Sequence, residues 1–423
     1  MADRHLGLRR RLLLAAVELL NAANAVKPIG RRGYSTVLAF AFGWPTSENA
    51  PLVISGSALD ALRRAIRGDY RSASGRISLL LKVISWALLV LVHRRNVQSR
   101  SYFEDPVREA LADEYPSALR PLRRGEVYST SMSRRRYVRK TVHYGPHRAN
   151  LADIWMRPDL PRDGKAPVLL QVPGGAWMIG MRRPQSYPLM SHLAEQGWIC
   201  VSIGYRISPR HPWPNHIIDV KQALAWVKAN IAEYGGDPDA VCITGGSAGG
   251  HLTALAALTP NDPKWQPGFE DADTSVAAAV PVYGRYDWFS TTGAGRQEFV
   301  EILERLIVKL PLDGNDQVYK DASPITLVHP DAPPFFVLHG VNDSLIPVRE
   351  GREFVKALRE VSNSPVIYAE IPHAQHAFDV FGSPRGHYTA DAVSEFLNWA
   401  RVRAQSTTVL GEDELDDDVA SAY

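Results

Sequence analysis

The sequence predicts an α/β fold in which a mostly parallel central sheet carries helices on both faces, preceded by a helical N-terminal extension. From about residue 137, short apolar runs that end near glycine alternate with longer stretches of helical spacing. This is the pattern of a parallel sheet with helical crossovers. Before that point, long apolar segments interspersed with arginine replace the alternation. We therefore divide the chain into an extension (1–125), a body (126–405) and an acidic tail (406–423).

Eight apolar runs predict the strands, and the first two alternate in polarity as a half-buried hairpin does. The runs lie at residues 137–145, 150–158, 166–175, 197–206, 240–246, 276–284, 333–340 and 364–372. Helical spacing predicts helices over Leu189–Gln196, His216–Tyr234, 247–258, Pro347–Val361 and Tyr388–Arg403. In a parallel sheet, reactive groups gather beyond the carboxyl ends of the strands. We therefore look for chemistry in the segments that follow the runs.

Charge is distributed unevenly along the chain, although the formal net charge is only +3. Residues 1–140 contain 25 Lys and Arg against 11 Asp and Glu, so the remainder is acidic. A basic region favours contact with nucleic acid or with an anionic membrane surface. Here the arginines are scattered between apolar runs and no nucleic-acid-binding module is present. We therefore expect no nucleic acid partner. The basic region is expected either to contact a membrane surface or simply to be solvated.

Three apolar segments of the extension bear on its relation to a membrane. The first follows the arginines at 9–11, but polar residues such as Glu18 interrupt it, which argues against a cleaved signal peptide. The second ends at Pro45, and the third runs from Ile77 to His93 and contains Lys82. A span needs about 20 apolar residues. We therefore favour a cap over the body or a peripheral attachment, in a cytoplasmic or peripherally membrane-associated protein, over a span through residues 77–93.

The polar segments and the cysteines allow simpler predictions. Residues 95–135 are rich in arginine and broken by prolines, which predicts a linker or an irregular wrap, and the acidic tail is predicted to be disordered. Cys200 and Cys242 lie in apolar runs, so we expect two buried reduced thiols. The spacing of cysteine and histidine does not favour a metal site, and no cofactor is expected. The sequence does not define an oligomeric state.

The motif Gly-Gly-Ser-Ala-Gly at residues 245–249 lies between a predicted strand and a predicted helix. Gly-x-Ser-x-Gly in this place is typical of a sharp turn that projects a serine hydroxyl above a sheet. The N-terminus of the following helix directs free N–H groups toward negative charge. A phosphate-binding loop is the competing interpretation, but the motif lacks the Gly-Lys-Ser/Thr ending. We therefore expect Ser247 to be a nucleophile.

A serine hydroxyl needs a histidine to take its proton and a carboxylate to orient that histidine. Asp343 and His376 follow the last two predicted strands, in the chain order serine, acid, histidine. Asp287, which follows an earlier strand, and His373, beside Pro372, are the alternatives. For His211, His251 and His339 we favour structural roles.

The segment Val-Pro-Gly-Gly-Ala-Trp at residues 172–177 follows the third strand. Glycines there let the chain approach a substrate closely. We expect an oxyanion hole formed by the backbone N–H groups of Gly175, Ala176 and Ala248, with Gly174 shaping the turn. Removing one such donor lowers the rate by about 100- to 1000-fold.

Residues 137–403 resemble the hormone-sensitive-lipase-like esterases and the related carboxylesterase and feruloyl-esterase-like hydrolases of the α/β-hydrolase superfamily. The resemblance is carried by VPGGAW, YRISPRHPWPNHIIDV, YGGDPDAVCITGGSAGGHL, HGVNDSLIPV and HAQHAFD. The extension is similar to those of membrane-associated actinobacterial lipases and esterases. The resemblance implies a carboxylesterase or lipase that acts without a metal on short- to medium-chain acyl esters or lipids.

Two residues depart from the family pattern. Pro173 stands where the family usually has histidine, and Gly246 stands where it usually has aspartate. Neither carries the proton transfer, so the chemistry is expected to survive, while the rigidity of the oxyanion loop is put in question. Two other functions use similar machinery or the same fold: an amidase such as a peptidase, formamidase or deacetylase, and a non-catalytic hydrolase-like protein that binds at a membrane surface.

Overall fold

An eight-stranded sheet forms the centre of the body, as the sequence predicts. The computed structural model describes residues 2–30, 33–111 and 135–420, with side chains described between residues 10 and 403 of these ranges. In sheet order the strands are β1 (Val138–His143), β2 (Leu151–Trp155), β4 (Ile199–Ile203), β3 (Ala166–Val172), β5 (Gly236–Gly246), β6 (Ala278–Val282), β7 (Phe335–Gly340) and β8 (Val366–Ile371). Strands β4, β3 and β5 to β8 run parallel, and β2 joins β1 and β4 in antiparallel pairs.

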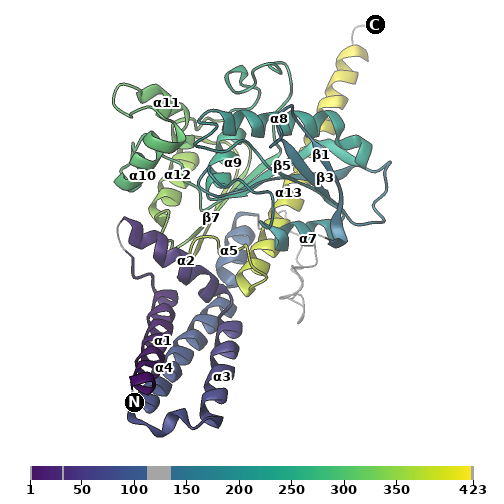
Figure 1. Cartoon of the computed structure of the whole chain (residues 1–423). Coiled ribbons are helices and arrows are strands. Elements are labelled where there is room, and N and C mark those ends of the chain that lie inside the picture. The colour runs from purple at the N-terminus through teal and green to yellow at the C-terminus, as the bar shows by residue number, and fades with distance from the viewer. Residues whose placement is uncertain (1, 31–32, 112–134, 421–423) are drawn as a thin grey trace.

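Helices cover both faces of the sheet (Figure 1). The helices of the body are α7 (Tyr187–Glu195), α8 (Asn215–Asn230), α9 (Ala248–Leu258), α10 (Gln297–Ile302), α11 (Asp316–Asp321), α12 (Val348–Val361) and α13 (Pro384–Ala420). One apolar core joins the sheet to α8, α9 and α12. The second core joins the opposite face to α7, α13 and α5 (Ser101–Ala110). The parallel strands therefore end between two packed layers, and the loops that follow them meet at one edge.

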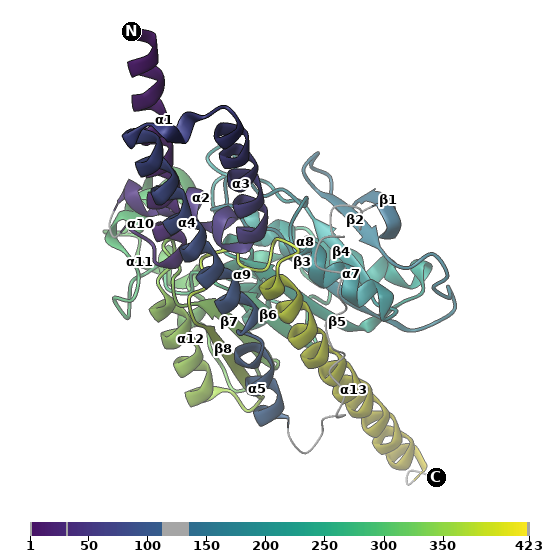
Figure 2. The same ribbon diagram turned by 90° about the horizontal axis from the view of Figure 1, so that it is seen from below.

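Up to residue 97, the described part of the extension forms the α-helices α1 (Ala2–Val26), α2 (Tyr34–Glu48), α3 (Ala50–Ile66) and α4 (Ala73–Val97). Helices α1, α3 and α4 project from the body as a bundle, and α2 lies between that bundle and the body (Figures 1 and 2). Side-chain packing between α1 and α4 runs through small residues such as Ala22 and Ala25. The predicted boundary at residue 125 lies outside the described residues.

Two segments differ from the sequence-based expectations. Residues 101–110, predicted as part of a linker, form α5, because Phe103 and Val107 lie one turn apart and enter the second core of the body. The acidic tail, which the sequence predicts to be disordered, also differs from the expectation, because helix α13 continues through it to Ala420. A helix that is already nucleated in the body extends at little cost for each added residue.

Candidate active site

Ser247 occupies the turn between β5 and α9. Its backbone has φ 59° and ψ −122°, a conformation that a residue with a side chain rarely adopts. Its N–H donates to the carbonyl oxygen of Val282 at the end of β6, 2.9 Å away. This hydrogen bond fixes the strained turn against the neighbouring strand. The hydroxyl-bearing residue is thus held at the carboxyl end of the sheet, where the sequence predicts it.

Glycines let the chain pass close to this turn. A Cβ at Gly249 would lie 2.1 Å from the carbonyl oxygen of Val172, and one at Gly245 would lie 2.6 Å from the same atom. A Cβ at Gly174 would lie 2.5 Å from the carbonyl oxygen of Gly246 and 3.1 Å from the Cβ of Ser247. No side chain fits at these positions without movement of the backbone. The loop after β3 is therefore packed directly on the serine turn.

Asp343 and His376 are paired in the loops that follow β7 and β8. Asp343 Oδ2 lies 2.6 Å from His376 Nδ1, and both side chains are buried. The other carboxylate oxygen, Oδ1, accepts hydrogen bonds from the N–H groups of Leu345 and Ile346, each at 2.8 Å. Both oxygens are thus occupied, which fixes the carboxylate and orients the imidazole that it contacts.

The charge of Asp343 is stabilised by its surroundings. Burial alone would raise the pKa of this carboxyl, but His376 and His339 together hold the pKa well below its usual value. His339 Nε2 lies 3.4 Å from Asp343 Oδ2 and 3.0 Å from the carbonyl oxygen of Ile346. The side-chain oxygen of Gln375 accepts the N–H groups of both Ser344 and His376, at 2.7 and 2.8 Å. Gln375 therefore ties the acid loop to the histidine loop.

Tyr283 connects the histidine to the serine turn. Its ring centroid lies 4.6 Å from that of His376, and a Cβ at Gly246 would come within 2.7 Å of the same tyrosine ring. The Tyr283 hydroxyl donates to the buried carboxyl of Asp379. Among the described residues, no hydrogen bond joins Ser247 directly to His376. The structure thus pairs the acid with the histidine and places both the histidine and the serine turn against one tyrosine ring.

The loop after β3 presents backbone donors beside Ser247. Gly175, Ala176 and Trp177 all have positive φ, at 123°, 51° and 58°. Within the described part of the chain, the N–H groups of Gly175 and Ala176 have no hydrogen-bond partner, while Ala248 supplies the first N–H of α9. Unpaired donors beside a serine turn are what an oxyanion requires.

The departure at Pro173 does not leave this loop unsupported. Gln185 accepts the N–H of Gly174 at 2.7 Å, and the Tyr205 hydroxyl donates to the carbonyl oxygen of Pro173 at 2.9 Å. Trp177 is buried, and its Nε1 donates to His251 Nδ1 on α9 at 3.2 Å. Hydrogen bonds to the side chains of Gln185, Tyr205 and His251 therefore hold the loop in place.

The departure at Gly246 also has a physical reason. The ring of Tyr283 fills the space that a side chain at position 246 would need, with both Cε2 and the hydroxyl within 2.7 Å of an added Cβ. An aspartate at this position would overlap that ring. The tyrosine and the glycine are thus a matched pair in this chain.

The alternative residues lie elsewhere. Asp287 accepts hydrogen bonds from Thr291 and Thr292 at 2.8 to 2.9 Å and so stabilises its own loop. His373 is exposed and does not contact Asp343 among the described residues. His251 is buried between Trp177 and the carbonyl oxygen of Ala322, and burial lowers its pKa to about 3. It is a neutral, structural histidine.

Sequence reasoning missed the residues that α2 contributes to this site. The Phe40 ring meets the His376 ring edge-on, with centroids 5.6 Å apart, and Phe40 stacks on Trp44. Trp44 Nε1 donates to the carbonyl oxygen of Ala377 at 2.6 Å, directly after the histidine. Ser344, directly after the acid, donates through its hydroxyl to the carbonyl oxygen of Thr36 at 3.0 Å. The helix of the extension therefore packs on both loops.

Comparisons with known sequences agree on the class of protein. Residues 153–358 match the BD-FAE family model. The chain is 48% identical to the probable carboxylic ester hydrolase LipM of Mycobacterium tuberculosis, over 91% of this chain and 92% of that protein. It is also 54% identical to the esterase LipQ of the same organism, over 62% of this chain and 63% of that protein.

Solved structures show the same fold. A truncated carbohydrate esterase from gut microbiota matches 63% of this chain and 98% of its own, with a TM-score of 0.53 at 21% identity. Esterase 2 of Thermogutta terrifontis, phosphonylated by sarin, matches 61% of this chain and 93% of its own, with a TM-score of 0.54 at 24% identity. With the similarity to LipM over nearly its full length, these findings establish that the chain belongs to the carboxylic ester hydrolases of the α/β-hydrolase superfamily.

Proposed function

We propose that this carboxylic ester hydrolase acts through a triad of Ser247, His376 and Asp343 and a covalent acyl-enzyme. The observation that carries the proposal is the buried 2.6 Å pair between Asp343 and His376, beside a tyrosine ring that also covers the Ser247 turn. In apo enzymes, hydrogen bonds between nucleophile and base are often long and tighten only with substrate. The missing direct bond between Ser247 and His376 is compatible with this mechanism.

The reaction proceeds in two displacements. His376 accepts the proton of the Ser247 hydroxyl as the serine oxygen bonds to the ester carbonyl carbon. The N–H groups of Gly175, Ala176 and Ala248 donate to the resulting oxyanion. The bond to the alcohol oxygen then breaks, and His376 returns the proton to the departing alcohol. Water, deprotonated by His376, attacks the acyl-enzyme, and collapse of the second oxyanion releases the acid and restores the serine.

Asp343 keeps the histidine in the productive tautomer. Its lowered pKa supports an ionised carboxylate over the whole neutral range, so Nδ1 of His376 carries the proton and Nε2 is free to act as base. The charged form of His376 that arises during each displacement is stabilised by the same carboxylate. No metal or organic cofactor takes part in the proposed mechanism.

The proposed substrates are short- to medium-chain acyl esters, including esters derived from lipids. The arginine-rich, apolar extension supports attachment to a membrane and hence a role in lipid metabolism. An acyl-chain series of p-nitrophenyl esters on the full chain tests the preference. The full chain is required because α2, which would be lost with the extension, packs on the histidine loop. Matched anilide and N-formyl substrates test amide cleavage, which we expect to be much slower than ester cleavage.

A fluorophosphonate probe tests the nucleophile. We expect covalent labelling of the full chain, and loss of labelling together with a fall of around a million-fold in kcat in Ser247→Ala. Ser364→Ala, at a half-buried serine whose hydroxyl has no partner among the described residues, is the matched control and should leave both unchanged. Near-normal turnover of p-nitrophenyl butyrate by Ser247→Ala would exclude the proposed triad.

A further inference from the structure

In the extension, large apolar side chains are exposed and small or polar side chains are buried, which is the opposite of the arrangement in a water-soluble bundle. Of the 29 exposed large hydrophobic side chains among the described residues, 21 lie between Leu13 and Val97. In that same region the buried hydrophobic residues are alanines together with Leu89 and Val92 only. The buried polar side chains of the region are Asn24, Thr36, Thr46, Ser47, Glu48, Ser78, Lys82, Ser85 and Asn96. Exposed apolar patches of this extent mark a surface that something apolar covers.

An ion cluster lies between the helices of the bundle. Lys82 on α4 is only 1% exposed, and its Nζ lies 2.7 Å from the partly exposed Glu18 on α1 and 3.3 Å from the partly exposed Asp60 on α3. The same Nζ lies 3.1 Å from the hydroxyl of Ser57, which also accepts a hydrogen bond from Trp86 Nε1. An ionisable side chain at membrane depth faces the bundle interior and is paired there. Lys82, which made a span unfavourable in the sequence, is thus satisfied by its neighbours.

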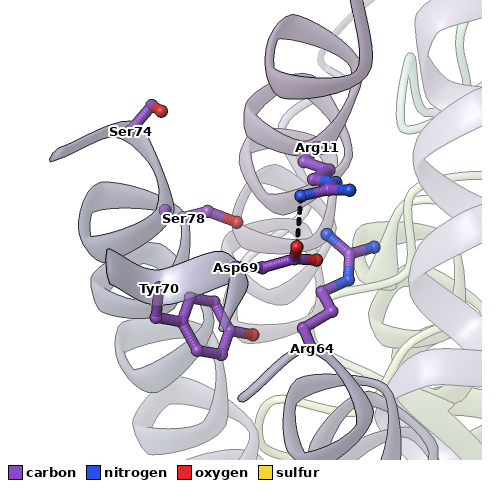
Figure 3. Close-up of a pocket in the computed structure, with 7 residues that line it drawn as sticks. Arg11, Arg64, Asp69, Tyr70, Ser74 and Ser78 are labelled. Carbon is purple, nitrogen blue, oxygen red and sulfur yellow. Dashed lines mark ion pairs between the residues drawn. The ribbon is translucent and has the colours of Figure 1, made fainter. Parts of the chain in front are cut away.

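Arginines lie at both ends of the apolar band. At the end far from the body, Arg11 pairs with Asp69 at 2.8 Å, and Arg64 lies beside this pair in the same crevice (Figure 3). Three further exposed arginines, at positions 67, 71 and 76, lie in the turn after α3 and at the start of α4. At the end near the body, α4 carries Arg94 and Arg95. Such cations match the phosphates of two headgroup layers.

The length of the band also fits a bilayer. The apolar part of α4, from Ile77 to Val92, is about 24 Å long at 1.5 Å per residue. The hydrocarbon core of a bilayer is about 30 Å thick, and flanking arginines that extend toward the headgroups make up such a difference. The stretch Ala73–Ala110 is long and apolar enough to cross a membrane by length and composition.

We propose that α1, α3 and α4 cross a lipid bilayer as an inside-out bundle, and that α2 lies in the headgroup layer under the active-site loops. The exposed face of α2 supports its place, since Val37, Leu38 and Phe42 point outward while Thr36 and Gly43 are buried. A half-inserted bundle is disfavoured because the charged arginines at its far end would lie in hydrocarbon, where a charged side chain is costly. A second copy of the chain would cover one side only, whereas apolar residues are exposed on all three helices.

Cysteine accessibility tests the proposal directly. Cys200 and Cys242 are buried, so an introduced cysteine is the reactive thiol. Ile84→Cys and Leu310→Cys form a matched pair, because the native side chains are 40% and 42% exposed. In sealed phosphatidylglycerol–phosphatidylethanolamine vesicles, we expect a water-soluble maleimide to label Ile84→Cys about tenfold or more slowly than Leu310→Cys, since thiolate formation requires water. Equal labelling after unfolding in detergent and urea shows that both thiols are competent.

Two further measurements distinguish a membrane-spanning bundle from one that is bound at the surface, half-inserted or covered by a second copy of the chain. Ala73→Cys lies at the far end of the bundle, so an impermeant maleimide added outside should label only one of Ala73→Cys and Leu310→Cys until the vesicles are opened. The protein should also remain with the vesicles in alkaline carbonate, which releases proteins that are bound only to the surface. Equal rates for Ile84→Cys and Leu310→Cys, labelling of both ends from outside, or release into the carbonate supernatant would each overturn the proposal.

The labelling result does not depend on the proposed reaction. Ser247→Ala should give the same pattern of protection as the active chain, so failure of the membrane proposal and failure of the triad are separately visible.

Discussion

The body and the bundle bury opposite kinds of side chain. In the body, valine, isoleucine, leucine and aromatic residues fill two cores, and the buried, hydrogen-bonded pair of Asp343 and His376 lies at the sheet edge beside the candidate nucleophile. In the bundle, alanine and polar residues are inside and the large apolar side chains are outside. The same rule, that apolar surface leaves water, accounts for the body in water and agrees with the proposal that the bundle lies in lipid. Under the proposed mechanism the charge of Asp343 serves chemistry, and under the proposed membrane placement the charge of Lys82 serves helix association.

The largest expected effect follows from neutralising the charge in the body. Asp343→Asn preserves the shape of the side chain but favours the wrong histidine tautomer, so kcat on a soluble ester should fall by about 10⁴-fold. Thermal unfolding of the body should change little by comparison. Asp287→Asn is the matched control, since Asp287 was the alternative acid, and its kcat should stay close to that of the wild type. A comparable loss in Asp287→Asn would mean that the acid is assigned to the wrong loop.

Removing the charge in the bundle should have the converse effect. Lys82→Met removes one partner from Glu18, which keeps Ser57, and one from Asp60, which keeps Arg64. Loss of hydrogen bonds to charged groups of this kind destabilises by about 1.5–3 kcal/mol. We expect a lower unfolding temperature of the bundle in detergent, followed by circular dichroism. Lys82→Arg keeps the charge and should recover much of the loss. Hydrolysis of a soluble ester by folded Lys82→Met should stay within a few-fold of wild type, and a loss as large as that of Asp343→Asn would break the distinction between the two regions.

Two glycines provide a smaller test of the same contrast. Gly246→Ala places a Cβ 2.7 Å from the Tyr283 ring, and overpacking of this kind costs about 1–3 kcal/mol. Because that ring also contacts His376, kcat/KM should fall as well. Gly56→Ala, in α3, meets no atom within 4 Å and replaces a helical glycine, so the bundle should gain up to about 1 kcal/mol. Chemical unfolding of both variants measures the two signs.

The candidate site rests on local features that a single sequence displays. Apolar runs bounded by glycine define the strands, and the chain order of serine, acid and histidine selects Asp343 and His376 from the loops that follow. These inferences need only neighbouring residues and the rule that parallel strands end at one edge. The glycines of the serine turn are likewise explained by contacts within two adjacent loops.

Contacts between distant segments could not be predicted in the same way. Trp44 and Ala377 are 333 residues apart in the chain, and no periodicity in either segment indicates that they meet. From the sequence alone, glycine in place of aspartate at position 246 is a weakened motif. In the structure, Tyr283 occupies the space that the aspartate side chain would need. In the sequence, Lys82 is an isolated charge in an apolar run and argues against a span. Its partners, Glu18 and Asp60, lie on two other helices and are not apparent from that run. The role of such a residue depends on a contact with a distant segment, and a single sequence does not show that contact.

The smallest expected effect lies where the two regions meet. Trp44→Phe keeps the ring beside Phe40 but removes the hydrogen bond to the carbonyl oxygen of Ala377, worth about 0.5–1.5 kcal/mol. If α2 helps to position the histidine loop, kcat should fall by about 2- to 10-fold, the rate equivalent of that energy, while KM changes little. Trp86→Phe makes the same change inside the bundle, where Nε1 donates to Ser57, and should leave kcat unaltered. Equal kcat values for both variants and the wild type would show that the extension carries the body without taking part in its active site.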